Sequence, residues 1–571
     1  MWLAWATVSA LGAPQVGVAW WGEYRVGTGL VFLTALAGAW ALGAGAGRRG
    51  ARLVSDALVV GCALNALVAV AEQLVGLQAF GVTPFGGRSS GLYGNPVYLA
   101  ELLCGGLWLA LCSVAHPPPT ASRARHHTMM ATAVLITAGI ELSGSRSALV
   151  LAVLVTAVMS VGPCRQPAAG CAGRDGSRRS PDRRAPSEDV VASAAGSATT
   201  SRGRGRSVVV LSTVAVGLVL GAGVGALAPG STTSTGRVAA DTGGYSSRLH
   251  TWAEGLSALR ARPVLGWGPG GFLAAAGPRR SLAVARAEGP ETLFADAHDL
   301  VIESVVTTGP VGAVLLGLWL TAAFGLAGDR RHRPSNGTSR TASTSSEHPG
   351  GAGLGGFAGL VLAASLVEPM HPGVTPLALL ALGSASSGAL PRAATRARGL
   401  HTTTVRSAAA AVTAGGVAVS CWLVAGLISL HHADVGADPA GAAEAARRLP
   451  PVGEPAAVAG RLIAFRGITR RDSTDTGEAR RWWTIAAHQD PASPSRWNDL
   501  GDALGKAGGP TASAAAYRRA LADNPWSVRA LRGLVRVGRN GDVDPTELDR
   551  SRQRIDRVAP GSPPRAAPTE P

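Results

Sequence analysis

Long apolar runs separated by short polar segments dominate residues 1–430 of the chain. A membrane-spanning helix needs about 20 mostly apolar residues, because the hydrocarbon core is about 30 Å thick and a helix rises about 1.5 Å per residue. About eleven runs approach or exceed this length. They lie at residues 2–21, 27–46, 53–76, 92–115, 128–142, 146–162, 207–228, 300–327, 353–367, 374–390 and 408–430. The pattern predicts an all-α fold, a polytopic bundle of about 11 transmembrane helices.

Two parts of this pattern are weak. Pro14 interrupts the first run, which also lacks the basic start and the cleavage site of a secretory signal. The runs at 353–367 and 374–390 are short and are separated by the segment E-P-M-H-P (368–372).

The arginine positions predict the orientation of the bundle, because short cytoplasmic loops carry an excess of Lys and Arg. A basic cluster follows every even-numbered run. The clusters include Arg48, Arg49 and Arg52, Arg123 and Arg125, the segment 163–206, Arg330, Arg331 and Arg333, and Arg392, Arg396, Arg398 and Arg406. We therefore expect a multi-pass membrane protein with a cytoplasmic N-terminus. The loop at 229–299 and the C-terminal tail would be extracytoplasmic.

Composition agrees with this interpretation. Only 16% of the residues are charged, whereas soluble domains average about 25%. The net charge of +17 could indicate a nucleic-acid partner, but most of it lies in the predicted cytoplasmic loops. The segment 163–206, rich in Arg, Ser, Gly and Pro, is predicted to be a disordered topology determinant. The six cysteines form no C-x-x-C motif and indicate neither disulfides nor a zinc site.

Few charged residues remain on the predicted outer face. Arg146 follows a small-residue turn in S-G-S-R-S (143–147), at a helix start. Arg248 lies in S-R-L-H-T-W (247–252), which begins an amphipathic helix. Guanidinium groups and helix N-termini both favour phosphate oxygens. These two arginines are therefore candidates for binding a phosphorylated substrate.

His298 lies in D-A-H-D-L (296–300), where the outer loop re-enters the membrane. A neutral imidazole there could take a proton from an acceptor hydroxyl, with Asp296 or Asp299 to orient it. No carboxylate cluster of the metal-binding kind stands on this face, so we expect neither a metal ion nor a cofactor.

A family resemblance joins these motifs. The order G-R-S-S-G-L-Y-G-N-P, S-G-S-R-S, S-R-L-H-T-W, P-V-L-G-W-G-P-G-G-F, A-H-D-L and T-G-P-V-G resembles the O-antigen ligase and polymerase superfamily over residues 85–390. That resemblance implies a polytopic, inverting glycosyltransferase. Such an enzyme moves a glycan from an undecaprenyl-diphosphate carrier to an acceptor outside the cytoplasmic membrane, in cell-surface polysaccharide biosynthesis.

The resemblance also implies residue roles. Arg146 and Arg248 would bind the diphosphate, and His298 would activate the acceptor. Arg88 and Asn95 match a motif that would touch glycan or phosphate. The chain departs from the family at Asp299, where asparagine is common and a substrate contact is still expected, and at Thr307, where many members carry a carboxylate. Glu303 is another possible partner of His298.

The polar segment 431–555 has the pattern of a tetratricopeptide-like helical tail. W-N-D-L-G (497–501) is followed by Tyr517, Ala520 and Pro525, and a shift of 34 residues recovers Gly467, Trp483, Ala486 and Pro491. We expect either a spacer or a docking surface for an acceptor or a protein partner. Residues 556–571 are predicted to be disordered.

The sequence leaves other functions open. A lipid-linked glycan flippase would carry charged residues along a path within the helices. A peptidoglycan polymerase of the shape and division type is also polytopic and polyprenyl-dependent, and a non-enzymatic scaffold would work through the tail. The sugar, the acceptor (polymer, lipid or protein) and the choice between ligase and polymerase are not determined.

Overall fold

The computed structural model describes residues 1–23, 26–77, 87–117, 122–161, 188–228, 231–235, 237, 244–328, 350–387, 422, 425–470, 473–540 and 543–560. Every regular element in these ranges is a helix, which confirms the all-α prediction. The chain forms two compact units. The first comprises residues 1–47, 242–333 and 365–571, and the second comprises residues 48–241 and 334–364.

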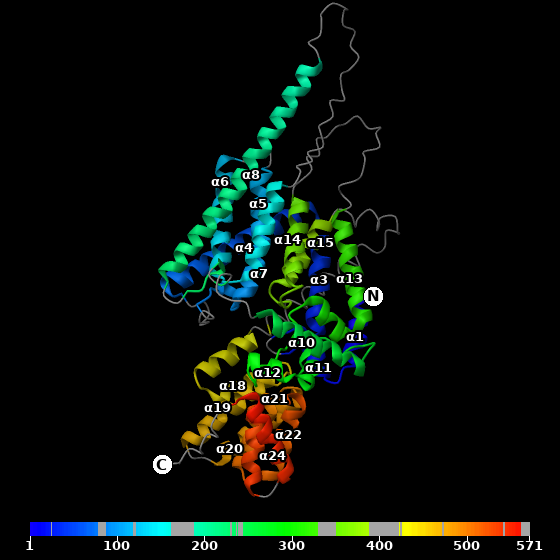
Figure 1. The fold of residues 1–571 in the computed structure, drawn as a ribbon, viewed down its shortest axis with the longest axis vertical. Helices are drawn as coiled ribbons and strands as arrows, with labels where there is room; N and C mark the ends of the chain where they lie inside the picture. The colour runs from blue at the N-terminus through cyan, green and yellow to red at the C-terminus, as the bar shows by residue number, and fades with distance from the viewer. Residues whose placement is uncertain are drawn as a thin grey trace, which may run out of the picture. The chain divides into compact units, whose positions relative to one another are not determined.

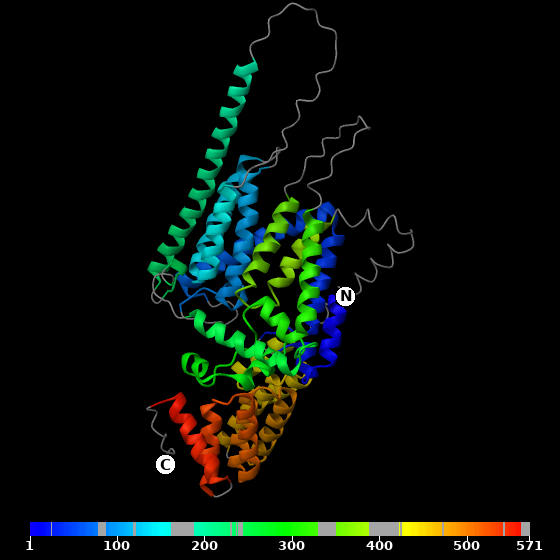
Figure 2. The same cartoon turned by 45° about the vertical axis from the view of Figure 1, so that its right-hand side comes forward.

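Helices of the second unit surround α5 (Pro96–Ala115). Its other members are α4 (Gly47–Val75), α6 (Arg123–Leu142), α7 (Arg146–Val161), α8 (Glu188–Leu227) and α14 (Gly350–Ala364). Gly105 and Gly106 let α5 approach its neighbours, because a Cβ there would lie 2.7 Å from the ring of Phe357 and 2.5 Å from Sγ of Cys62. Figure 2 shows the long α8 running beside α6.

The membrane part of the first unit contains helices from both ends of the predicted bundle, with α3 packed on α15 and α1 packed on α13 (Figure 1). Its helices are α1 (Trp2–Leu11), α2 (Val16–Trp21), α3 (Leu30–Gly45), α13 (Leu300–Gly328) and α15 (Thr375–Ser386). The connecting loop carries α10 (Gly244–Ala258), η3 (Leu259–Ala261), α11 (Phe272–Ala276), η4 (Gly277–Arg279) and α12 (Leu282–Glu288).

Four described helices are long and apolar enough to cross a membrane. They are Gly47–Val75, Pro96–Ala115, Ser207–Leu227 and Leu300–Gly328. Shorter apolar helices occupy the predicted spans at 2–21, 27–46, 146–162, 353–367 and 374–390. The run at 408–430 lies largely outside the described residues. The polytopic architecture is confirmed, and the count of eleven spans stays a prediction.

Two predicted helices are not continuous. The run at 2–21 divides into α1 and α2 around Pro14, whose ring prevents a regular helix from continuing. The run at 300–327 has a kink at Gly309, where φ is +74° and Pro310 follows. A Cβ at Gly309 would lie 1.9 Å from the carbonyl oxygen of Val264, so the loop reaches the helix only because this residue is glycine.

The prediction of disorder for 163–206 is wrong for residues 188–206, because α8 begins at Glu188. This stretch is rich in alanine, and adding turns to an existing helix is far easier than nucleating a new one. Residues 163–187 lie outside the described part of the chain.

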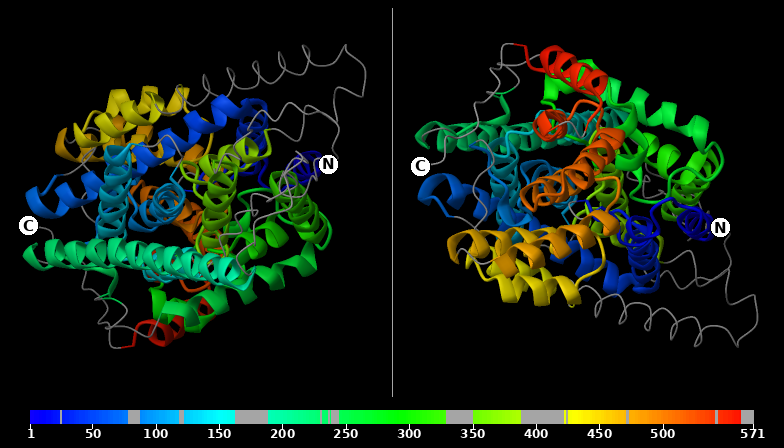
Figure 3. Two further views of the ribbon diagram at one scale, coloured as in Figure 1. Left: turned by 90° about the horizontal axis from the view of Figure 1, so that it is seen from above. Right: turned by 90° about the horizontal axis from the view of Figure 1, so that it is seen from below.

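The tail of the first unit is a succession of helices, each packed on the next: α18 (Pro439–Arg448), α19 (Glu454–Arg470), α20 (Ser473–Gln489), α21 (Pro494–Lys506), α22 (Pro510–Asp523), α23 (Val528–Val537), η6 (Gly538–Asn540) and α24 (Pro545–Val558). Seen from below in Figure 3, they follow one another in a curved row. Tyr517 packs tightly against Gly501 and Gly533, where a Cβ would meet its ring at 2.7 Å and 2.4 Å. The tetratricopeptide assignment stays a prediction. Helix α24 extends three residues past the predicted tail boundary at 555, and residues 561–571 lie outside the description.

The tail packs on the loop that precedes α13 within the first unit. Nε1 of Trp526 donates to the carbonyl of Arg280 over 2.8 Å, and Nδ2 of Asn524 donates to that of Pro290 over 2.9 Å. Oγ of Ser527 donates to the carboxylate of Glu291 over 2.8 Å. These bonds hold the tail on the same loop that carries Arg248 and His298.

Candidate active site

His298 occupies a strained turn directly before α13. Its φ is +51°, a left-handed conformation that is uncommon for residues other than glycine. Asp296 stabilises the turn, because its Oδ1 accepts the backbone N–H of His298 over 2.8 Å and lies 2.6 Å from the ring Nδ1. When Nδ1–H donates to this carboxylate, Nε2 of the neutral ring is left as the proton acceptor.

Opposing effects act on the pKa of His298. Burial lowers its pKa, whereas the hydrogen bond to Asp296 and the charge of that carboxylate raise it, and the net pKa lies above the ordinary histidine value. Asp296 is therefore the orienting carboxylate. Asp299, the other candidate, instead accepts the N–H of Ile302 over 2.6 Å and caps α13. Its contact with substrate stays a prediction.

The backbone on the other side of the turn is also held. Nε1 of Trp252, on α10, donates to the carbonyl of Ala297 over 2.7 Å. The N–H of Ala297 donates to Oε2 of Glu303 over 2.9 Å. The ring of Phe294 meets the imidazole edge-on at a centroid distance of 5.6 Å. Glu303 thus contacts the backbone of the turn, whereas Asp296 contacts the His298 ring.

The side chain of Arg248 contacts the segment that connects α14 to α15. Its Nη2 lies 3.2 Å from Oε2 of Glu368, and its Nη1 donates to the carbonyl of Val367. The charges of Arg248 and Glu368 both act on the pKa of His298, the first lowering it and the second raising it. The structure therefore places Arg248 within electrostatic range of His298 and adds Glu368 as the partner of the arginine.

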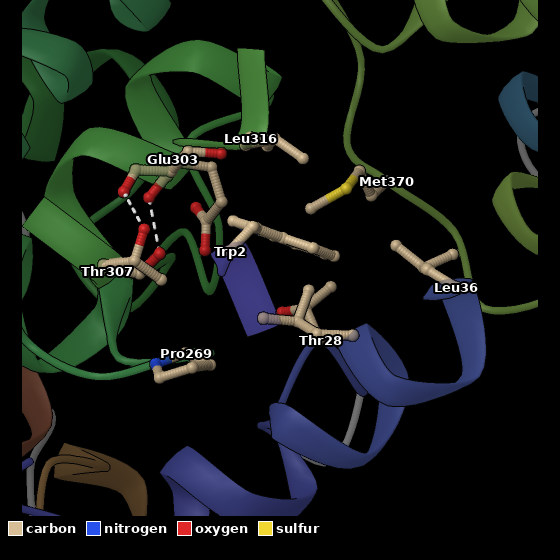
Figure 4. A pocket seen from close by; sticks show the side chains of 11 residues that line it. Trp2, Thr28, Leu36, Pro269, Glu303, Thr307, Leu316 and Met370 are labelled. Atoms are coloured by element: carbon tan, nitrogen blue, oxygen red, sulfur yellow. Dashed lines mark hydrogen bonds between the residues drawn. The ribbon is translucent and has the colours of Figure 1, made fainter. Parts of the chain in front are cut away.

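A small cavity lies beside Glu303 and Thr307 of α13 (Figure 4). Its volume is about 30 Å³, and its lining includes Trp2, Thr28, Glu303, Thr307 and Met370. Oε1 of Glu303 and Oγ1 of Thr28 are both buried without a protein hydrogen-bond partner. A space of this size with two polar groups on its wall is large enough for ordered water.

The remaining candidates belong to the second unit. Arg146 is the first residue of α7, after a turn in which Gly144 has a φ of +61°. Nε of Arg88 donates to the carbonyl of Ser143 over 2.8 Å. The structure therefore places the side chain of Arg88 against the turn that precedes Arg146. Asn95 caps α5, with Oδ1 accepting the N–H of Val97 over 2.9 Å. Its predicted contact with glycan or phosphate stays a prediction.

The sequence missed Arg237. Its Nη1 donates to the carbonyl of Gly144 over 3.0 Å, beside the bond made by Arg88. The only signal in the sequence was a lone arginine in a polar stretch of the predicted outer loop, T-S-T-G-R (233–237), and nothing local links that stretch to residue 144. Among the described residues, no three His, Cys, Asp or Glu side chains are grouped so that they could hold a metal ion.

Comparison with known proteins identifies a family model that matches part of the chain. Residues 131–317 match the model of the O-antigen ligase family, a narrower range than the predicted 85–390. The matched range includes Arg146, Arg248 and His298, and Arg88 and Asn95 precede it. None of the curated proteins matches the chain. The chain therefore carries an O-antigen ligase domain at residues 131–317, which supports its resemblance to the superfamily of O-antigen ligases and polymerases.

Proposed function

We propose that this protein transfers a glycan from an undecaprenyl-diphosphate carrier to an acceptor hydroxyl at the outer face of the bacterial cytoplasmic membrane. The observation that carries the proposal is the Asp296–His298 pair, with a ring nitrogen 2.6 Å from a carboxylate oxygen, in the same unit as Arg248. This is the arrangement of a general base whose tautomer is fixed by a carboxylate.

The proposed reaction is a single displacement. The acceptor oxygen attacks the anomeric carbon while Nε2 of His298 takes its proton. The bond from that carbon to the diphosphate oxygen breaks, and the electron pair leaves on the phosphate. Attack opposite the leaving group inverts the anomeric centre. Arginine charges stabilise the departing diphosphate without a metal ion.

Arg248 and Arg146 have different surroundings in this scheme. Glu368 holds the Arg248 guanidinium within the electrostatic range of His298. Arg146 stands at a helix N-terminus, where the partial positive charge of the helix adds to its own. The family resemblance implies that each of them contacts the diphosphate.

The topology and the tail complete the proposal. The arginine distribution supports a cytoplasmic N-terminus and an extracytoplasmic tail. Because Trp526 and Asn524 hold the tail on the loop of the candidate site, a docked acceptor or partner protein would be presented next to that loop. A tetratricopeptide-like surface suits such docking.

The direct test uses the purified full-length protein in lipid nanodiscs with a lipid-linked glycan donor. We expect Arg146→Ala, Arg248→Ala and His298→Gln to lose transfer, with His298→Gln still binding donor. Arg260→Ala, an exposed change on η3, is the matched control and should keep full activity. Wild-type turnover in all three variants would refute the assignment.

A second experiment separates the two reactions of the superfamily. Mass spectrometry of a deletion strain should show accumulated lipid-linked glycan. Single repeat units on the carrier would indicate a polymerase, and finished polymer would indicate a ligase. An unchanged profile of lipid-linked and surface glycans would contradict both.

A further inference from the structure

Three segments that are far apart in the sequence meet at one end of the second unit. The N–H of Ser89 donates to the carbonyl of Leu142, and the N–H of Thr232 donates to that of Gly87, each over 3.0 Å. Oγ of Ser234 donates to the carbonyl of Ile140 over 3.0 Å. Each segment contributes one arginine to this junction: Arg88, Arg146 and Arg237.

The three arginines converge on the turn at 143–146. Arg88 and Arg237 donate to the carbonyls of the consecutive residues Ser143 and Gly144 over 2.8 Å and 3.0 Å. Arg146 follows two residues later and begins α7. Gly144 makes the convergence possible, because a Cβ there would lie 2.6 Å from the carbonyl oxygen of Thr232 and 3.0 Å from Nε of Arg88.

The buried carboxylates nearby have other hydrogen-bond donors. Glu72 accepts the N–H groups of Ser90 and Gly91 over 2.8 Å and 3.1 Å, which fixes the segment that carries Arg88. Glu141 accepts the N–H of Thr235 over 3.1 Å and also its hydroxyl, which fixes the segment that carries Arg237. These carboxylates thus order the arginine-bearing segments.

All three arginines are half-buried and so remain accessible to a ligand. An anion bound between them would interact favourably with all three guanidinium charges. This interaction is stronger at a membrane surface, where the effective dielectric constant is lower than in bulk water. Two linked phosphoryl groups present enough oxygens to engage several guanidinium groups at once.

We propose that Arg237 is the third arginine of an anion site formed with Arg88 and Arg146, and that this site binds the diphosphate of the lipid-linked donor. The inference rests on the proposed function and deepens it. It assigns donor binding to a residue of the outer loop that none of the sequence motifs contains. The start of α7 adds its partial positive charge to the site.

The test is the binding of undecaprenyl diphosphate to the full-length protein in nanodiscs, with undecaprenyl monophosphate as the comparison ligand. Arg237→Ala should weaken the affinity for the diphosphate about tenfold or more, because it removes a charge-assisted hydrogen bond. The affinity for the monophosphate should fall less. In transfer assays kcat/KM for the donor should fall about tenfold or more, because the lost charge contacts the group that departs.

Two further variants separate charge from folding. Arg237→Gln can keep a hydrogen bond to Gly144 and should still lose diphosphate affinity, whereas Arg237→Lys should recover part of it. Arg260→Ala should bind as wild type. Wild-type diphosphate affinity in Arg237→Ala and Arg237→Gln would overturn the inference.

A failure of the proposed function can be distinguished from a failure of the inference about Arg237. If Arg146→Ala and His298→Gln both keep wild-type transfer, the donor chemistry itself is wrong, whatever Arg237 does. If those two variants lose transfer while Arg237→Ala binds diphosphate normally, only the third-arginine site is refuted.

Discussion

Replacing Asp296 by asparagine tests the base at the centre of the proposed reaction. Asparagine keeps the size of the side chain and can still accept the backbone N–H of His298, so the turn should persist. The change removes the charge that lies 2.6 Å from Nδ1. A hydrogen bond to a charged group contributes about 1.5 to 3 kcal/mol, against about 1 kcal/mol for a neutral one. The expected loss is therefore about 1.5 kcal/mol, which corresponds to about one pKa unit.

The direction of the pH effect follows from the two opposing influences on the pKa of His298. Burial lowers the pKa of His298, and Asp296 raises it above the ordinary value. A general base works only when neutral, so the acid limb of the kcat–pH profile should follow this pKa. In Asp296→Asn the limb should move down by about one unit. The maximal kcat should fall about tenfold or more, because the imidazolium formed in the transition state loses its counter-charge.

The assay is kcat at saturating donor between pH 5 and pH 9. Asp299→Asn is the matched control, because its carboxylate caps α13 and asparagine caps helices equally well. It should leave the acid limb in place. An unmoved limb and an unchanged rate in Asp296→Asn, or the same shift in both variants, would refute the assignment of Asp296 as the partner of the base.

Three further predictions test the surroundings of the site and the tail. Glu303→Ala should reduce transfer and destabilise the His298 turn by about 1 to 3 kcal/mol, because it leaves the N–H of Ala297 unpaired. Glu303→Gln should restore transfer and stability. Equal losses of transfer and of thermal stability in the two variants would contradict this. Trp526→Ala should loosen the tail by about 2 kcal/mol through the lost contact with Arg280, seen as faster hydrogen exchange in residues 494–558; unchanged exchange would disprove that anchor. Burial and neighbouring carboxylates raise the pKa of Asp490 from 3.8 to about 7, so its contribution to stability is favourable below pH 4 and is lost as the pH rises toward 7. Asp490→Asn should therefore stabilise the tail at pH 8 by about 2 kcal/mol and have little effect at pH 4, and a stability gain that does not depend on pH would count against this.

The helices could be predicted because their signals are local. A run of apolar residues, a proline or a capping side chain acts within one or two turns, so most of the predicted runs recur as helices with bounds that shift by a few residues. An exception is α8, which begins at Glu188 and not at residue 207. The interruption at Pro14 was visible for the same reason. The kink at Gly309 was not predicted, because that glycine is required by the carbonyl of Val264, a residue far away in the sequence.

The chemistry of the site was predictable only in part. The residue types Arg146, Arg248 and His298 could be named from the sequence, because charges on the outer face of a membrane bundle are few and the family motifs contain them. The partner of His298 could not be chosen, since Asp296 and Asp299 flank it closely on either side. The left-handed turn decides for Asp296, because it places the carboxylate against both the N–H and the ring of His298.

The sequence alone indicated the membrane class of the chain, most of its helices and its resemblance to the O-antigen ligase family. These depend on local hydrophobicity and on short motifs. Tertiary structure decided which charged groups meet. Glu368 reaches Arg248 across 120 residues of chain, and Arg237 reaches the turn before Arg146 across 93. Such pairings follow from backbone hydrogen bonds and close approaches between distant segments, and no local pattern of residues encodes them.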